Sequence, residues 1–284
     1  MSNKYRFLLI QAFHLPKNSQ YLHRAVDGPK ESMLMNYETV KPLLDDVDWE
    51  LHHGPLATYG DWPVETREEF TLVAAGRLAI VREACESGRY NGIVLLGGGE
   101  PGFPASREIA RPYGIPVVAC GFAQMHVASM LGNKFSVVDL AGNHNMYYYD
   151  LIVSHRFDQR CASIRNINYP LPRPPDMGQS QVHLAKNRAQ RGETSEVVEA
   201  ALREALAAIE EDGADVITLG CSALFWLKPV LQKRLDALGW EVPVLEGYSC
   251  AITLAKAMVD LRLSASGLVY PSAHPKKWRR KKLF

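Results

Sequence analysis

The sequence predicts an α/β protein with two similar halves, each a four-stranded parallel sheet flanked by helices. Three observations lead to this prediction. Short apolar runs of strand length alternate along the chain with longer stretches of helical periodicity. The same order of elements occurs twice. The chain has 284 residues, of which 47% are hydrophobic and 22% charged, which suffices for one large domain or two modest ones.

Four apolar runs in the first half have the length of β-strands. They cover residues 5–10, 49–53, 92–97 and 115–120. Helical patterns lie between them, most clearly over residues 65–87. This alternation indicates parallel strands joined by crossover helices.

The second half repeats this plan, with strand candidates at residues 134–139, 161–167, 214–220 and 242–247. Residues 116–131 align without gaps with residues 243–258, and residues 93–98 align with residues 216–221. We therefore expect a duplicated unit that forms two pseudo-symmetric, Rossmann-like lobes with the active site in the cleft between them. Residues 1–119 with 245–284 are assigned to lobe 1, and residues 120–244 to lobe 2.

The duplication places one turn at the carboxyl end of the third strand in each half. The first turn contains Gly97, Gly98 and Gly99, and the second contains Gly220, Cys221 and Ser222. Ligands of α/β sheets bind beyond the carboxyl ends of strands, so these turns are the first candidates for a functional site.

The first of these turns also has the spacing of a dinucleotide-binding loop, since Gly97, Gly99 and Gly102 fit G-x-G-x-x-G. Three features argue against that interpretation. The turn follows the third strand candidate rather than the first, Glu100 would repel a pyrophosphate, and no acidic residue stands where the ribose would be held. We therefore predict neither a nicotinamide cofactor nor any other.

Composition narrows the partners to small molecules. The net charge is +1, so the body of the protein has no field that favours nucleic acid or a membrane. The amino end shows no targeting signal, and we expect a cytoplasmic protein. The five cysteines have no CxxC spacing and the adjacent His52 and His53 face opposite sides of a strand, so we predict neither a disulfide framework nor a metal site.

Two segments are biased in composition. Residues 276–282 are basic except for Trp278 and are more typical of a solvated end than of a nucleic-acid or membrane contact. Residues 169–192 are rich in Pro, Gly, Gln and basic residues without clear periodicity, and they are equally well interpreted as a lid or as a plain surface insertion.

Several motifs in order identify a family resemblance over nearly the whole chain. They are GGGEPG, PVVACGFAQMHVASMLGNKFSVV, IEEDGADVITLGCSA, VPVLEGYSCAITLAKAMVDL and LVYPSA. With them the chain resembles the aspartate/glutamate/hydantoin racemase superfamily, most closely its hydantoin (allantoin) racemase branch. The resemblance implies a cofactor-independent, homo-oligomeric enzyme that moves a proton at a carbon next to a carboxyl or carbonyl group, with two cysteines on opposite faces.

The chain departs from this pattern at three places. Cys221 matches the second cysteine, but either Gly97 or Gly98 stands where the first is expected. Gln11, with the two residues after it, replaces an asparagine-rich turn, and Asp139, followed by leucine, replaces a pair of small hydroxyl residues. The substrate is therefore expected to differ from a plain hydantoin, although a carboxylate, amide or hydantoin-like group is retained in the prediction.

The resulting hypothesis is a racemase-type or isomerase-type enzyme with a single thiol. Cys221 is the candidate catalytic group, and a helix expected over residues 223–238 favours its thiolate. Backbone N–H groups in the two turns are expected to stabilise an enolate. The predicted substrate-binding residues are Gln11, Gly97, Gly98, Gly99, Glu100, Asp139, Gly220, Ser222 and Ala223, although Glu100 is more simply a structural residue of the turn.

Loss of the first cysteine leaves alternatives open. A one-sided decarboxylase or lyase needs one proton carrier, as in the related arylmalonate decarboxylases, and maleate isomerases of the superfamily add a thiolate to an unsaturated diacid. A two-lobed binding protein that has lost catalysis is the third alternative. The other cysteines, Cys85, Cys120, Cys161 and Cys250, are expected to serve packing, and His126 is expected to be structural.

Overall fold

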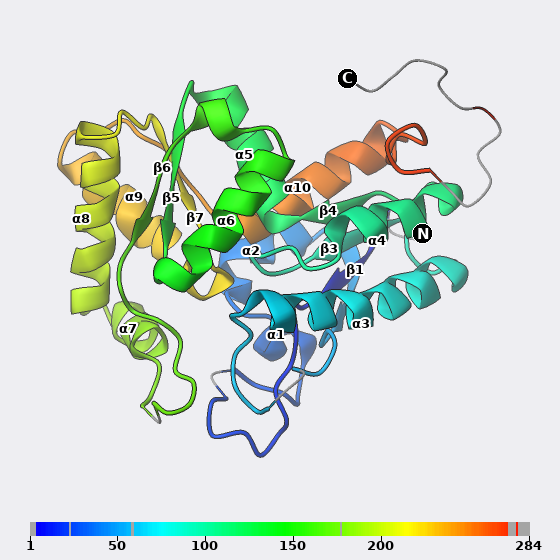
Figure 1. Cartoon of the computed structure of the whole chain (residues 1–284), viewed down its shortest axis with the longest axis horizontal. Coiled ribbons are helices and arrows are strands. Elements are labelled where there is room, and N and C mark those ends of the chain that lie inside the picture. Colours follow the sequence, from blue (N-terminus) through cyan, green and yellow to red (C-terminus); the bar gives the residue numbers. More distant parts are fainter. Residues whose placement is uncertain (1–3, 23, 58–59, 177, 272–276, 278–284) are drawn as a thin grey trace.

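The computed structural model describes residues 4–22, 24–57, 60–176, 178–271 and 277, and the basic segment 276–282 therefore lies outside the described residues except for Lys277. Two four-stranded parallel sheets lie side by side in it (Figure 1). The first sheet has the order β2-β1-β3-β4, and the second has the equivalent order β6-β5-β7-β8. The predicted α/β class and the four strands per half are thus confirmed.

Most of the strands are shorter than the apolar runs that predict them, because the ends of those runs enter turns or the next helix. They are β1 (Tyr5–Ile10), β2 (Val47–His52), β3 (Gly92–Leu95), β4 (Val117–Ala119), β5 (Phe135–Asp139), β6 (Cys161–Asn166), β7 (Val216–Leu219) and β8 (Val244–Leu245).

Helices cover both faces of each sheet. They are α1 (Lys30–Met33), α2 (Tyr37–Leu44), α3 (Arg67–Glu86), α4 (Phe103–Ala110), α5 (Cys120–Leu131), α6 (Gly142–Ser154), α7 (Gln181–Gln190), α8 (Glu196–Glu210), α9 (Leu227–Ala237) and α10 (Gly247–Asp260), with single 3-10 turns at Arg111–Tyr113, Asp158–Arg160 and Ser222–Leu224. None of the described helices is both long and apolar enough to cross a bilayer.

The alternation of side chains along each strand explains why both faces need helices. In β1, Phe7 and Leu9 are buried in one core cluster, while Leu8 and Ile10 are buried in a second cluster on the opposite face. The second of these clusters includes residues of α3 and α4, and the first includes residues of α2 and α10. The inner strands β1, β3, β5 and β7 are therefore buried on both sides, as expected for a parallel sheet, whereas the edge strands β2 and β6 are partly exposed.

Helices α5 and α10 follow the fourth strand of each sheet and connect the two halves. They pack against each other between the sheets, and α10 also packs against β3 and β4 of the first sheet (Figure 1). The aligned sequences of residues 116–131 and 243–258 thus form equivalent strand-to-helix units in the two halves. The lobe boundaries at residues 119 and 244 remain a prediction.

Two expectations about helices need correction. The helix expected over residues 223–238 begins only at Leu227, after the 3-10 turn, and Pro229 fits its first turn because the missing N–H would lack a helical partner there. The segment 169–192, which shows no clear periodicity, contains α7. That helix buries only Val182 and Ala185, so its apolar pattern is too sparse to stand out in the sequence.

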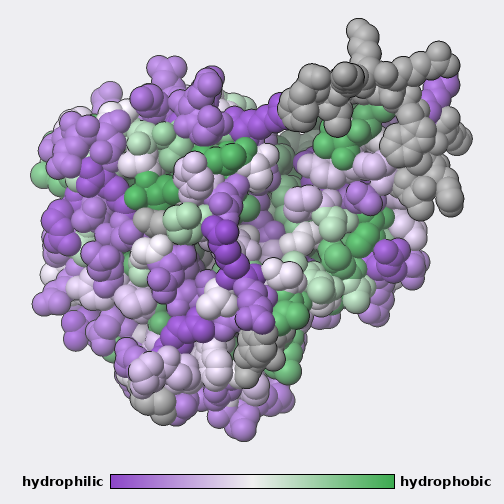
Figure 2. All heavy atoms as spheres, viewed as in Figure 1, coloured by the Kyte–Doolittle hydropathy of each residue, from purple (hydrophilic) through white to green (hydrophobic). Residues whose placement is uncertain are grey.

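The surface that Figure 2 shows is mostly polar, with hydrophobic side chains in small groups. This agrees with the burial of most apolar residues in the cores between the two sheets and the helices that cover them.

Candidate active site

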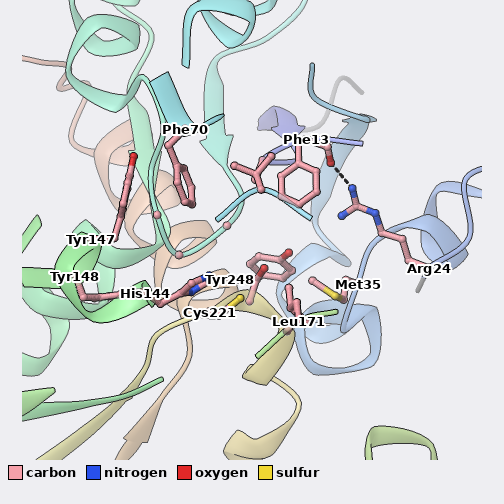
Figure 3. Close-up of a pocket in the computed structure, with 17 residues that line it drawn as sticks. Phe13, Arg24, Met35, Phe70, His144, Tyr147, Tyr148, Leu171, Cys221 and Tyr248 are labelled. Atoms are coloured by element: carbon pink, nitrogen blue, oxygen red, sulfur yellow. Dashed lines mark hydrogen bonds between the residues drawn. The ribbon is translucent and has the colours of Figure 1, made fainter. Parts of the chain in front are cut away.

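The thiol of Cys221 stands where the second sheet meets the first. Strand β7 ends at Leu219, and Cys221 is the residue before the 3-10 turn, with an extended backbone at φ −74° and ψ 141°. Its N–H donates a hydrogen bond of 3.0 Å to Oδ1 of Asp139, at the end of neighbouring strand β5. The half-buried side chain lines a cavity (Figure 3).

The two duplicated turns touch at Gly98. A Cβ atom added to Gly98 would lie 2.1 Å from the carbonyl oxygen of Gly220, so only glycine permits this approach. The same carbonyl accepts a hydrogen bond from the hydroxyl of Tyr148 on α6. The glycine turn is thereby held directly beside the thiol turn.

The cavity between these turns is lined from both sheets. Six of the predicted site residues lie on its wall, namely Gly97, Gly98, Gly99, Cys221, Ser222 and Ala223. Most of the remaining lining is apolar or aromatic, with Phe13, Met35, Val64, Phe70 and Leu171. Its free volume is about 60 Å³, room for about two water molecules. Lining segments must therefore move before a substrate enters.

The other four predicted residues lie behind this wall. Nε2 of Gln11 donates to the Met33 carbonyl at 2.9 Å, and Glu100 accepts hydrogen bonds from the Phe122 N–H and, at 2.8 Å, from His155. Gly220 turns its carbonyl to Tyr148. Asp139 is fully buried and supports Cys221 through the hydrogen bond described above. These residues hold the two turns in place.

His144 is the main residue that the sequence analysis misses. It lies in the first turn of α6, its Nδ1 is 3.7 Å from Oδ1 of Asp139, and its side chain is 12% exposed. Figure 3 shows its imidazole directed at the sulfur of Cys221. A lone histidine in an asparagine-rich stretch gives little signal in the sequence, except that it follows a strand whose last residue is acidic.

The pKa of His144 is raised well above its usual value. Burial by itself lowers this pKa, but the charge and hydrogen bonding of Asp139 and of Cys221 outweigh the burial. Oδ2 of Asp139 is buried without a hydrogen-bond partner among the described residues, so a protonated imidazole is the charge that compensates this carboxylate. The arrangement places a cation beside the Cys221 thiol.

Three tyrosines complete the polar lining. Burial raises the pKa of Tyr147 to about 12 and raises the pKa values of Tyr148 and Tyr248 further, so all three remain neutral phenols at physiological pH. The rings of Tyr147 and Phe70 pack with their centroids 3.9 Å apart, which joins α6 of the second half to α3 of the first. These residues shape the cavity, and the Tyr148 hydroxyl is already donated to the carbonyl oxygen of Gly220.

The remaining cysteines are unlike Cys221. Burial raises the pKa of Cys85 and Cys161 to about 11, that of Cys250 to about 12, and that of Cys120 well above its usual value. None of these four lines the cavity. They stay protonated at physiological pH and pack as small apolar groups.

His126 packs its ring edge-on against Phe122 and Phe157, in keeping with a structural role. Across the described residues, no three His, Cys, Asp or Glu side chains come together in a way that could hold a metal ion.

The beginning of segment 169–192 closes one side of the cavity. Leu171 is part of the lining, and two residues later Arg173 forms ion pairs with Glu69 at 2.9 Å and Glu65 at 3.3 Å, at the start of α3. Burial raises the pKa of Glu69, but the backbone N–H groups of Thr66 and Glu65, with Arg173, lower it to about 2. The carboxylate is therefore charged at physiological pH, and the ion pairs fasten this segment across the cavity.

We expect that Arg173→Ala loosens this closure. Iodoacetamide should alkylate Cys221 of the variant about fivefold faster than Cys221 of the wild type, because removing the ion pairs raises the population of open conformations. Peptide mass mapping over time gives the rate at Cys221. Arg165→Ala, which breaks an ion-pair cluster with Asp212 and Glu211 elsewhere, is the control and should leave the rate unchanged. Equal rates in wild type and Arg173→Ala would show that segment 169–176 does not limit access.

Comparisons with known proteins agree with this architecture. A family model described as Asp/Glu/Hydantoin racemase matches residues 63–255. The hydantoin racemase of Pseudomonas sp. (strain NS671) is 27% identical over 212 residues, which are 74% of this chain and 74% of that protein. The hydantoin racemase of Rhizobium meliloti is 28% identical over 203 residues, covering 72% and 74%.

Solved structures share the fold. Allantoin racemase from Klebsiella pneumoniae superposes with a TM-score of 0.67 at 23% identity and covers 96% of this chain and 95% of its own. A liganded double mutant of arylmalonate decarboxylase superposes with a TM-score of 0.54 at 14% identity, covering 90% and 92%. At these identities the structures support the two-sheet architecture alone.

Proposed function

The chain belongs to the Asp/Glu/hydantoin racemase family, and from that premise we propose that it uses one thiol, Cys221, to move a proton at a carbon beside a carboxyl or carbonyl group. The observation that supports this proposal most is the pairing of a cavity-lining thiol with a turn that offers only backbone groups. The relatives named above are racemases. The proposed reaction differs from two-sided racemisation because no second thiol among the described residues lies on the side of the cavity opposite Cys221.

The opposite face has no second acid–base group of the expected kind. Apart from Cys221, the titratable side chains on the described wall are His144 beside it, Arg24, and the three neutral tyrosines. No side chain fits at Gly98 for the reason given above. A proton can therefore be taken or returned by a thiol from one side only.

The turns supply groups that stabilise an enolate. The N–H groups of Gly98 and Gly99 donate to no protein acceptor within the described chain, whereas the backbone of Gly97 hydrogen-bonds the Cys120 sulfur. The 3-10 turn after Cys221 adds the N–H groups of Ser222 and Ala223 at its open end. Backbone donors aimed at a developing negative charge typically account for the largest share of such catalysis.

In the proposed reaction the protonated His144 lies beside Cys221 and stabilises the negative charge that forms on its sulfur. The thiolate removes the proton from the carbon, and the electron pair of the C–H bond passes into the enolate. Return of a proton to the same face of the same carbon gives back the substrate with an exchanged hydrogen. In an isomerase-type reaction on an unsaturated substrate, the thiol instead delivers the proton to the far carbon of the dienolate, and the double bond re-forms next to the carbonyl group. Neither route needs a group from outside the chain.

A one-sided decarboxylase is the second candidate, favoured by the absence of a second thiol on the glycine turn. In that reaction the bond between the α-carbon and a carboxyl group breaks. Carbon dioxide leaves, and the electron pair of the broken bond stays on the α-carbon and forms the enolate. Cys221 as a thiol then delivers the proton to one face, and water reprotonates the thiolate. His144 and Asp139 support both protonation states of the sulfur.

Incubation in deuterium oxide with two probes tests the proposal. A 5-benzylhydantoin should exchange its ring C–H for deuterium, or methyl(phenyl)malonate should lose carbon dioxide and give singly deuterated 2-phenylpropionate of one configuration. Proton NMR and chiral chromatography follow both. Cys161→Ala should behave as wild type. Racemic decarboxylation product, or neither exchange nor carbon dioxide release, would contradict one-sided proton transfer by Cys221.

A further inference from the structure

Arg24 is a cationic residue of the cavity wall that the proposed mechanism does not use. It lies in the segment between β1 and α1, and it lines the catalytic cavity together with Met35. The same two residues also line a neighbouring groove that has α1 and α2 on one side and α7 and α9 on the other. Its volume is about 470 Å³. Arg24 therefore stands at the junction between the catalytic cavity and the wider groove.

The guanidinium of Arg24 has few partners. It donates a hydrogen bond to the carbonyl oxygen of Phe13 and lies 6.0 Å from the centroid of the Phe13 ring. No Asp or Glu among the described residues forms an ion pair with it. A guanidinium has five N–H donors in a planar fork, so most of its capacity is unused.

The charge of Arg24 is also poorly compensated. Burial lowers its pKa, and the group that acts against this lowering is Tyr248, whose phenol is neutral at physiological pH and so provides no counter-charge there. Arg24 is half-buried in the cavity wall, and a carboxylate that reached its guanidinium there would supply the missing counter-charge.

The surrounding charges do not supply that partner. Asp27 is paired with Lys17 at 2.9 Å. The groove is also lined by two acidic residues, Glu31 and Glu38, and by Lys186. Those two carboxylates form no ion pair with Arg24 in the described structure.

We propose that Arg24 binds the carboxylate of the substrate, so that the substrate is an organic acid rather than an uncharged ring amide. This inference rests on the proposed function. Tyr248 lines the cavity with both Arg24 and Ser222 of the thiol turn, and each of these two residues influences the pKa of its phenol. A carboxylate held by the guanidinium would thus sit on the Tyr248 side of the cavity, with the rest of the molecule directed at Cys221.

A pair of probes that differ in charge tests this assignment. Phenylacetate and phenylacetamide have nearly the same shape, and calorimetric titration gives the Kd of each. Wild type should bind the carboxylate at least about tenfold more tightly, which is ~1.4 kcal/mol. Arg24→Met should lose this preference and Arg24→Lys should keep part of it, since lysine retains the charge without the fork.

The controls separate this inference from the proposed chemistry. Arg203→Met removes an exposed arginine of α8 and should keep the wild-type preference. Cys221→Ala should also keep the preference for phenylacetate over phenylacetamide, even if all activity is lost. If the wild type proves inactive on carbon acids, the proposed chemistry fails, but this binding preference is still expected. Equal affinity for the two probes in wild type, no binding of either up to about 10 mM, or an undiminished preference in a folded Arg24→Met would overturn the assignment.

Discussion

Replacing Cys221 by alanine is expected to lower kcat/KM on any substrate found by at least about a thousandfold. The thiol is the proton carrier in both candidate reactions, and the facing turn offers no side chain that could replace it. The backbone donors of the two turns remain, so a small residual rate is expected from enolate stabilisation alone. Steady-state kinetics on the purified variant measure the loss.

The fold should survive this change, since Cys221 is only half-buried and its structural hydrogen bond is made by the backbone. Thermal unfolding checks this point. Cys161→Ala provides the matched comparison, because that thiol is also half-buried but lies away from the cavity. Full activity in a correctly folded Cys221→Ala would rule out the proposed role of this residue.

Replacing His144 by glutamine is expected to lower kcat/KM by about a hundredfold and to slow alkylation of Cys221 at neutral pH by about tenfold. Glutamine keeps a hydrogen-bonding group but removes the positive charge beside the thiol. His126→Gln serves as the control, because that imidazole packs between aromatic rings outside the cavity. An unchanged alkylation rate in His144→Gln would show that His144 does not favour the thiolate.

The same variant should alter the pH dependence of stability. The pKa of His144 in the folded protein lies above that of an exposed histidine, so protonation of this residue stabilises the fold. The contribution is complete below about pH 6.5 and is lost as the pH rises through the raised value. The difference in Tm between wild type and His144→Gln should therefore be largest in mild acid and shrink toward alkaline pH.

The parts of the fold that could be predicted are those with a local, repeated pattern. Apolar runs such as that of β1 are buried on both faces, so they stand out in the sequence without any knowledge of their neighbours. The gapless alignment of residues 116–131 with 243–258 works because each copy begins as a strand and continues as a helix over the same core. The contact between the glycine and thiol turns follows from this duplication.

The parts that escaped prediction depend on how elements rotate and pack. Whether His144 faces Cys221 or solvent is decided by the orientation of α6, which no local spacing reveals. Arg24 lies in an irregular segment whose path is set by contacts with Phe13 and the cavity wall. The resemblance predicts a substrate contact for Gln11 and a structural role for Glu100 in its turn. In the structure the Gln11 side chain donates to the Met33 carbonyl and Glu100 accepts from the Phe122 N–H, and their part in substrate binding stays a prediction.

The contact at Gly98 limits how this enzyme could evolve or be redesigned. A Cβ on Gly220 would lie 2.5 Å from the carboxyl carbon of Asp139, so neither Gly98 nor Gly220 can be replaced by a larger residue without a clash. At Gly97 a Cβ would meet that of Ala12 at 2.8 Å, on a backbone with φ of +102° that side chains rarely adopt. Installing an opposing thiol therefore requires rebuilding the loop around Ala12 together with the turn, and a single base change in the gene would not be enough.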